Sequence, residues 1–272
     1  MRIAALHTYP VKGCHRLDHD EAGVEPWGLT GDRRWMLVDA GGVGVTQRET
    51  PLLTQLTVRP RPGGLRLSAP GLPEIDLDEP AGGPKVAVRV FRNKPEVPAR
   101  HAEAGSAWCS EFLGRDVRLA WQADPTGRTI PEAAQPGDRV SLADGYPVLL
   151  ANTASLDAVN GWLVEGGDEP VPMHRFRPNL VVDGAPAWAE DGWLGRRLRI
   201  GEVTFRVSKA CPRCRVTTID QETGETGRQP LTVLGQHRRI DGGLMFAVNL
   251  IPELSAGDTG VLRVGDSVVP QE

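Results

Sequence analysis

Short runs of alternating apolar and polar residues follow one another along most of this chain, separated by glycine and proline. Residues 202–207 alternate strictly, and further strand-like runs cover 35–38, 65–67, 86–90 and 117–121. Successive side chains of a strand point to opposite faces, so a period of two residues predicts a strand with one buried face. Glycine and proline favour turns between such runs. The pattern therefore predicts a mainly β protein of barrel-like or sandwich architecture with a few short helices.

Residues 106–113 are the first stretch with helical spacing. Trp108 and Phe112 lie four positions apart and would share one helix face. Ser106 is a suitable N-cap, and Gly114 can end the helix. Cys109 lies within this stretch, and we expect it in the core because free cysteine is usually buried.

A second helix is predicted to begin near Asn152 or Thr153, because either residue can cap a helix N-terminus. Its buried face would consist of Leu156, Val159 and Leu163, which recur at helical spacing.

Three further segments are assigned by composition. Residues 93–104 are polar and contain prolines, which predicts a connecting loop. Residues 124–138 are polar with scattered glycine and proline, and a loop of this length is typical of an active site. Residues 216–219 are β-branched throughout, which favours a strand.

Length, charge and cysteine usage limit the class of protein. A chain of 272 residues with 40% apolar residues can bury a full core, as one large β domain or two smaller ones. The net charge is -4, so no global field attracts nucleic acid, and any anion site must be local. No run approaches the ~20 apolar residues that cross a bilayer. Four cysteines are too few for a disulfide scaffold. We therefore expect a soluble cytoplasmic protein with reduced thiols and no membrane partner.

Candidate chemistry is concentrated at Cys211 and Cys214, where two thiols and two guanidinium groups occur within five residues. A structural zinc site would need a second cysteine pair, whereas Cys14 and Cys109 stand alone. A thioredoxin-type pair would need a helix after the motif, whereas a β-branched run follows. Two core thiols would rarely have arginines beside them. The fourth hypothesis is a single thiolate that ligates a soft metal, with arginine beside it holding an anionic cofactor.

Residues 211–220, Cys-Pro-Arg-Cys-Arg-Val-Thr-Thr-Ile-Asp, followed by Thr223-Gly224, resemble the signature of MOSC domains, the family that includes amidoxime-reducing components. The resemblance implies that Cys214 coordinates the molybdenum of a molybdopterin cofactor. It also implies that Pro212 and Arg213 lie against that cofactor.

Matches elsewhere in the chain add to the resemblance. Residues 9–14, Tyr-Pro-Val-Lys-Gly-Cys, are similar to a family motif whose lysine and next residue touch the cofactor. This implies contacts from Lys12 and from Gly13, which has only its backbone amide to offer in place of a serine hydroxyl. From the residues alone, a lone loop lysine is usually solvated.

Arginines of two further motifs are implied to bind the cofactor. Arg33 matches the arginine of an Asp-Arg-x-Trp pattern, and the adjacent Arg34 would point to the opposite face of a strand into solvent. Arg177, in Phe-Arg-Pro-Asn, is implied to bind the cofactor phosphate, and the following proline favours extended geometry for it. Arginine suits this role because its planar fork binds phosphate through two donors.

Two more stretches match the family without equal chemical detail. The resemblance implies that Asp144 and Gly145 bind pterin nitrogens through carboxylate and backbone. Residues 46–51 also match a family motif, to which we assign no chemistry.

The resemblance covers nearly the whole chain and implies two β-barrel-like domains, a MOSC N-terminal domain at residues 1–120 and a MOSC domain at residues 121–272. It implies a molybdenum-dependent reductase of N-hydroxylated or N-oxygenated small molecules, supplied with electrons by a separate flavin or iron-sulfur protein. We expect a monomer. The alternatives are a carrier of sulfur or of the molybdenum cofactor, and a zinc-stabilised β module.

Overall fold

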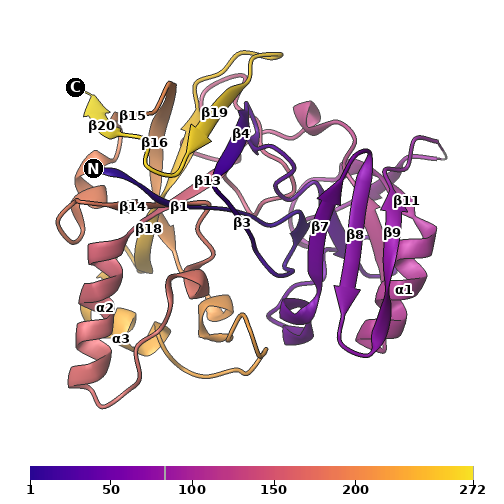
Figure 1. Cartoon of the computed structure of the whole chain (residues 1–272), viewed down its shortest axis with the longest axis horizontal. Helices are drawn as coiled ribbons and strands as arrows, with labels where there is room; N and C mark the ends of the chain where they lie inside the picture. Colours follow the sequence, from indigo (N-terminus) through magenta and orange to yellow (C-terminus); the bar gives the residue numbers. More distant parts are fainter. Residues whose placement is uncertain (83, 272) are drawn as a thin grey trace.

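The computed structural model describes residues 1–82 and 84–271, and it confirms a mainly β protein. In this part of the chain the strands form four sheets. Three α-helices accompany them: α1 (Glu103–Leu113), α2 (Thr153–Glu165) and α3 (Leu231–His237). The sheets fall into two halves that lie side by side, with α1 in one half and α2 and α3 in the other (Figure 1).

Nine strands form the largest sheet: β1 (Arg2–Thr8), β3 (Leu17–His19), β13 (Val148–Asn152), β14 (Leu180–Asp183), β15 (Arg197–Ile200), β16 (Val203–Pro212), β17 (Arg239–Ile240), β18 (Gly243–Pro252) and β20 (Val268–Gln271). Their order is β20-β15-β16-β18-β13-β14-β1-β3, with β17 paired to β18. β13 and β14 are parallel, and the other neighbours are antiparallel. The alternation at residues 202–207 thus correctly predicted the start of β16.

The remaining strands form three smaller sheets. A five-stranded sheet contains β2 (Val11–Lys12), β6 (Trp35–Val38), β10 (Val86–Val88), β11 (Val97–Ala102) and β12 (Arg118–Trp121), in the order β10-β11-β12-β6-β2. A meander contains β7 (Thr57–Arg61), β8 (Gly64–Ala69) and β9 (Leu72–Asp78), and a third sheet joins β4 (Glu21–Glu25), β5 (Gly28–Leu29) and β19 (Gly260–Arg263). Short 3-10 helices are η1 (Pro51–Gln55), η2 (Pro125–Gly127), η3 (Met173–Phe176), η4 (Ala189–Trp193) and η5 (Arg215–Thr218).

The N-terminal strands are built into sheets of the C-terminal half. β1 lies between β14 and β3, and β4 pairs with β19 near the end of the chain. Figure 1 shows these indigo strands among the orange and yellow ones. Strand pairing therefore crosses residue 120, and the division of the chain at that residue stays a prediction.

Each half has its own apolar core. Trp35, Leu37 and Leu67 belong to the core of the N-terminal half, whereas Leu150 and Phe205 belong to the core on one side of the largest sheet. A third cluster lies beneath α2 and α3 and contains Val159, Leu163, Val233, Leu234, Phe176 and Phe246. This cluster confirms the predicted inner face of α2.

The predicted caps are partly correct. Asn152 caps α2, because its side chain accepts a hydrogen bond from the amide of Ala154 at 3.2 Å. Gly114 ends α1 in the left-handed conformation, as predicted. The Ser106 cap is wrong, since α1 begins at Glu103. Ser106 instead donates from inside the helix to the carbonyl of Ala102, four residues earlier.

Two assignments by composition are wrong. Residues 93–104 include strand β11, where Val97 and Ala99 are buried on alternate positions despite the proline between them. Residues 216–219 are largely the 3-10 helix η5 rather than a strand. There the hydroxyls of Thr217 and Thr218 each donate to the carbonyl three residues back, and these local hydrogen bonds stabilise a helical turn against the β preference.

Helix α3 was not predicted, because it has only seven residues and its apolar residues, Leu231, Val233 and Leu234, are too few to show helical spacing. None of the helices within residues 1–82 and 84–271 combines the length and apolar character needed to span a membrane.

Candidate functional site

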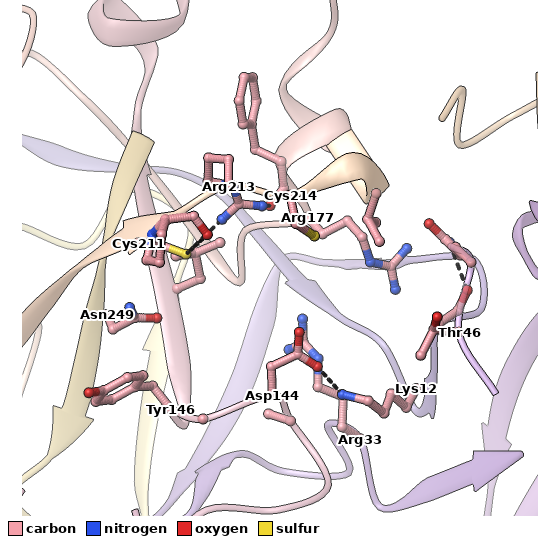
Figure 2. Close-up of a pocket in the computed structure, with 18 of the residues that line it drawn as sticks. Lys12, Arg33, Thr46, Asp144, Tyr146, Arg177, Cys211, Arg213, Cys214 and Asn249 are labelled. Carbon is pink, nitrogen blue, oxygen red and sulfur yellow. Dashed lines mark hydrogen bonds and ion pairs between the residues drawn. The ribbon is translucent and has the colours of Figure 1, made fainter. Parts of the chain in front are cut away.

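One cavity collects the side chains that the sequence singled out (Figure 2). All nine predicted residues line it: Lys12, Gly13, Arg33, Asp144, Gly145, Arg177, Pro212, Arg213 and Cys214. The rest of the lining is Val45, Thr46, Gln47, Arg48, Ala143, Tyr146, Leu149, Phe176, Asn179, Cys211, Val216 and Asn249. The structure thus brings together residues from both halves of the chain, while their roles toward a ligand stay predictions.

Cys214 follows the end of β16 and precedes η5, in extended backbone geometry. Its side chain is half-buried. Its Sγ atom accepts a hydrogen bond from Nη2 of Arg48 at 3.1 Å. The thiol therefore lies at a strand end beside a cation, where a ligand in the cavity can reach it.

Cys211 is a second half-buried thiol in the same cavity. Nη1 of Arg213 lies 2.9 Å from its sulfur, and Nη2 of Arg213 donates to the carbonyl of Phe176 at 2.7 Å. Figure 2 shows the sulfurs of Cys211 and Cys214 on the same side of the cavity.

The other two cysteines are buried in the core, which confirms the expectation for Cys109. Burial raises the pKa of Cys109 to about 12 and also raises the pKa of Cys14. Among the described residues there is also no cluster of three or more His, Cys, Asp and Glu side chains that could hold a metal ion. The zinc hypothesis therefore lacks a set of protein ligands in this part of the chain.

Lys12 forms an ion pair with Asp144 inside the cavity. The side chain of Lys12 is only 8% exposed, so the expectation of a solvated lysine is wrong. Burial lowers the pKa of Lys12 to about 8, although Asp144 opposes that shift. A cation that loses its proton so near neutrality makes the charge of the cavity sensitive to pH.

Asp144 lines the hollow with its carboxylate open to solvent, at 62% side-chain exposure. The protein around the carboxylate would by itself raise the pKa of Asp144, but Lys12 and then Arg48 outweigh this effect and hold the pKa well below its usual range. Asp144 is therefore ionised and already paired with cations of the protein.

The loop at residues 124–138 was expected to belong to the active site, but none of its residues lines the cavity. Arg128 instead donates to the backbone carbonyls of Ser141, Ala143 and Asp144. This loop therefore lies outside the cavity and stabilises the segment that carries Asp144.

Arg33 precedes β6 in a left-handed turn with φ of 48°, so it does not lie on a strand. Burial alone would lower the pKa of Arg33, but Asp32 beside it outweighs that effect and raises the pKa. The prediction that Arg34 is solvated is wrong. Its guanidinium donates to the carbonyls of Gln122 and Ala123 and so connects the segment after β12 to the turn.

Arg177 is also left-handed, with φ of 54° and ψ of 46°, so the prediction of extended geometry before Pro178 is wrong. Its guanidinium donates to Oε1 of Gln221 at 2.7 Å and to the carbonyl of Cys14 at 2.9 Å. These contacts fix the side chain and compensate for an unfavourable backbone conformation. Burial lowers the pKa of Arg177 to about 10.

Residues 46–48 reach the cavity, although sequence reasoning gave them no role. Gln47 is buried and exchanges two hydrogen bonds with Gln221 at 2.9 and 3.0 Å, and it also donates to the carbonyl of Gly13. Arg48 contacts Cys214 and lies 4.0 Å from Asp144. The only available signal was the motif match, because nothing in the local pattern distinguishes these side chains from those of a surface turn.

The cavity is locally basic although the protein is net acidic. Five cations line it, namely Lys12, Arg33, Arg48, Arg177 and Arg213, against the single carboxylate of Asp144 among the described lining residues. Charges of one sign in a walled hollow focus the field on it, so the cavity is suited to an anion.

Comparison with known proteins gives two family matches. A family model described as MOSC domain matches residues 137–269. A second, described as MOSC N-terminal beta barrel domain, matches residues 1–116.

Individual relatives match over nearly the full chain. Mitochondrial amidoxime-reducing component 1 of Mus musculus is 30% identical, over 98% of this chain and 81% of that protein. Mitochondrial amidoxime reducing component 2 of Homo sapiens is 31% identical, over 98% of this chain and 82% of that protein. Molybdenum cofactor sulfurase of Oryza sativa subsp. japonica is 27% identical, over 99% of this chain but only 35% of that protein.

Proposed function

The chain belongs to the MOSC-domain family, and on this premise we propose that it binds a molybdenum-molybdopterin cofactor and reduces N-hydroxylated or other N-oxygenated small molecules. One observation carries the proposal: the thiol of Cys214 shares a cavity with the neighbouring Arg213 and with four cationic side chains from distant parts of the sequence. The names of the amidoxime-reducing relatives support the substrate class.

The residues of the cavity fit such a cofactor by their chemistry. A thiolate is the protein ligand that soft and redox-active metals select, and the sulfur of Cys214 at a strand end can supply that ligand. Arginine guanidinium groups bind phosphate through paired donors, and Arg33 and Arg177 supply two of them. The carboxylate of Asp144 is paired with Lys12, so it does not repel an anionic ligand strongly.

We assign the residues as follows. Cys214 holds the metal, and Arg33 and Arg177 hold the phosphate. Lys12, Gly13, Pro212 and Arg213 contact the cofactor, and Asp144 and Gly145 bind pterin nitrogens. When bound, the molybdenum group supplies the two-electron exchange, while the protein supplies orientation and electrostatics.

We propose that the electrons for the reduction come from a separate flavin or iron-sulfur protein. Among the described residues, Cys14 and Cys109 are core thiols and Cys211 and Cys214 line the cavity, so these four do not form the cysteine set that an iron-sulfur cluster requires.

The test is metal and cofactor analysis of the natively expressed protein, together with an activity assay. We expect molybdenum and pterin near one per chain, and amidoxime reduction with reduced methyl viologen as the artificial donor. Cys214→Ala should lose the activity, whereas Cys109→Ala, which removes a core thiol outside the cavity, should retain it. An active Cys214→Ala variant would contradict the proposal.

A second candidate function is that of a carrier that delivers sulfur or the molybdenum cofactor to other enzymes. It is favoured by the presence of the second thiol, Cys211, beside Arg213 in the cavity, and by the match to a molybdenum cofactor sulfurase. Incubation with a cysteine desulfurase and cysteine, followed by mass spectrometry, tests it. A persulfide on Cys211 or Cys214 in protein that contains no molybdenum would favour this function over the reductase.

A further inference from the structure

The aromatic ring of Tyr9 lies against both arginines that we assign to the phosphate. Cζ of Arg33 is 4.5 Å from the ring centroid, and Cζ of Arg177 is 4.1 Å from it. A guanidinium at this distance is attracted by the negative face of an aromatic ring. Arg33 and Arg177 are far apart in the sequence, and this single ring is in contact with both.

The ring itself is fixed in place. Tyr9 is 1% exposed, and its hydroxyl donates to the carbonyl of Pro178 at 3.1 Å. Its backbone amide donates to Oδ1 of Asp32 at 2.7 Å, and the other carboxylate oxygen of Asp32 accepts from Arg33. Tyr9 thus joins the turn that carries Arg33 to the turn that carries Arg177.

Both arginines adopt the left-handed backbone conformation, which is unfavourable for residues other than glycine. Their φ values are 48° for Arg33 and 54° for Arg177. Such left-handed residues persist when surrounding contacts hold them, and they are often found at functional sites. The shared contact with Tyr9 is one of the contacts that hold both.

The two guanidinium groups also repel one another. Burial is the main cause that lowers the pKa of Arg177, and the charge of Arg33 lowers it further. Asp32 pairs with Arg33, and the ring of Tyr9 attracts both guanidinium groups without adding a second negative charge that would compete with an anionic ligand.

We propose that Tyr9 is a positioning residue that holds Arg33 and Arg177 together as a two-guanidinium clamp for one phosphate group. This inference rests on the proposed cofactor-binding function, since the phosphate is that of the cofactor. Tyr9 acts through the two arginines and has no contact of its own with the ligand, because it is not part of the cavity lining.

The test distinguishes the effect of the negative face of the Tyr9 ring on phosphate binding from the effects of its hydroxyl and of its packing. Full-length protein prepared without cofactor is titrated with inorganic phosphate, with wild type compared to Tyr9→Phe, to trifluorophenylalanine at position 9, and to Tyr9→Leu. Fluorination weakens the negative face of the ring with little change of shape, so it keeps the test valid if Tyr9→Leu does not fold. Trifluorophenylalanine at Phe112, which packs on Trp108, is the matched control.

We expect Tyr9→Phe and the Phe112 control to bind phosphate within about twofold of wild type. The fluorinated ring at position 9 should weaken phosphate binding by about fivefold or more, and Tyr9→Leu by about tenfold or more. The reason is that a cation–ring attraction is strongest when it is shielded from water, and each variant weakens or removes two such contacts. Molybdenum content of the same variants, isolated natively, should fall in the same order.

Three outcomes would overturn the inference. If the fluorinated variant binds phosphate as wild type does, Tyr9 does not position the arginines. If wild type binds no phosphate yet contains molybdenum, the clamp is wrong while the proposed function stands. A wild-type protein that has neither phosphate binding nor molybdenum would overturn both.

Discussion

Arg48 donates a hydrogen bond to the sulfur of Cys214 across 3.1 Å, and the two residues lie 166 positions apart in the sequence. Arg48 lies in a turn of the N-terminal half, whereas Cys214 follows a strand of the largest sheet. The proposed metal ligand therefore receives its hydrogen bond from the other half of the molecule. Hydrogen bonds to a ligating sulfur orient it and tune the metal.

We expect Arg48→Gln to reduce molybdenum retention or amidoxime reduction by about tenfold to a hundredfold, because partners of metal ligands typically contribute this much. Arg48→Lys should lose less, since it keeps the charge but not the planar fork. Molybdenum per chain, measured by elemental analysis, and kcat check this. Wild-type values for both variants would show that the contact has no functional role.

Anion binding to the cofactor-free protein should weaken as the pH rises through about 8. Lys12 is charged below its pKa of about 8 and neutral above it, so the cavity loses one positive charge in that range. Sulfate, which does not titrate there, is a suitable probe for calorimetry. The dependence should be absent in Lys12→Met, and a dependence that persists in this variant would assign it to another group.

Asp144→Asn should shift that pH dependence to lower pH. Asp144 raises the pKa of Lys12 against the effect of burial, so its removal leaves burial unopposed and the pKa falls below about 8. At low pH the same variant should bind sulfate more tightly, because the single carboxylate of the lining is gone. A midpoint that moves upward would contradict the assigned ion pair.

Arg34→Ala should lower stability without affecting the cavity. The side chain satisfies the carbonyls of Gln122 and Ala123, and loss of hydrogen bonds from a charged donor costs about 2 kcal/mol. Urea denaturation measures the loss. Molybdenum per folded chain should stay at the wild-type level, in contrast with Arg33→Ala, which should lower it.

The sequence predicts the parts of this molecule that depend on local pattern. The alternation at residues 202–207 predicts the start of β16. The side chain of Asn152, which can cap a helix, predicts the start of α2. The grouping of Lys12, Arg33, Arg177 and Cys214 in one cavity was anticipated through the family resemblance. No periodicity in the sequence brings those four residues together.

The failures have a common physical origin in contacts between distant segments. The proline after Arg177 favours an extended conformation, but Gln221 and the carbonyl of Cys14 hold the residue in the left-handed region. The role of Arg34 depends on carbonyls that lie 88 and 89 positions away. Arg48 was missed for the same reason.

The placement of β1 also has a consequence for synthesis of the protein. β1 is synthesised long before its partner β14, which ends at Asp183, so that edge of β1 stays uncovered until the intervening residues have been made. Long-range pairing of this kind slows folding, and an uncovered strand edge is prone to aggregation. We therefore expect the nascent N-terminal segment to depend on chaperones until β14 emerges. Removal of residues 1–8 should leave β14 and β3 without β1, the strand that lies between them.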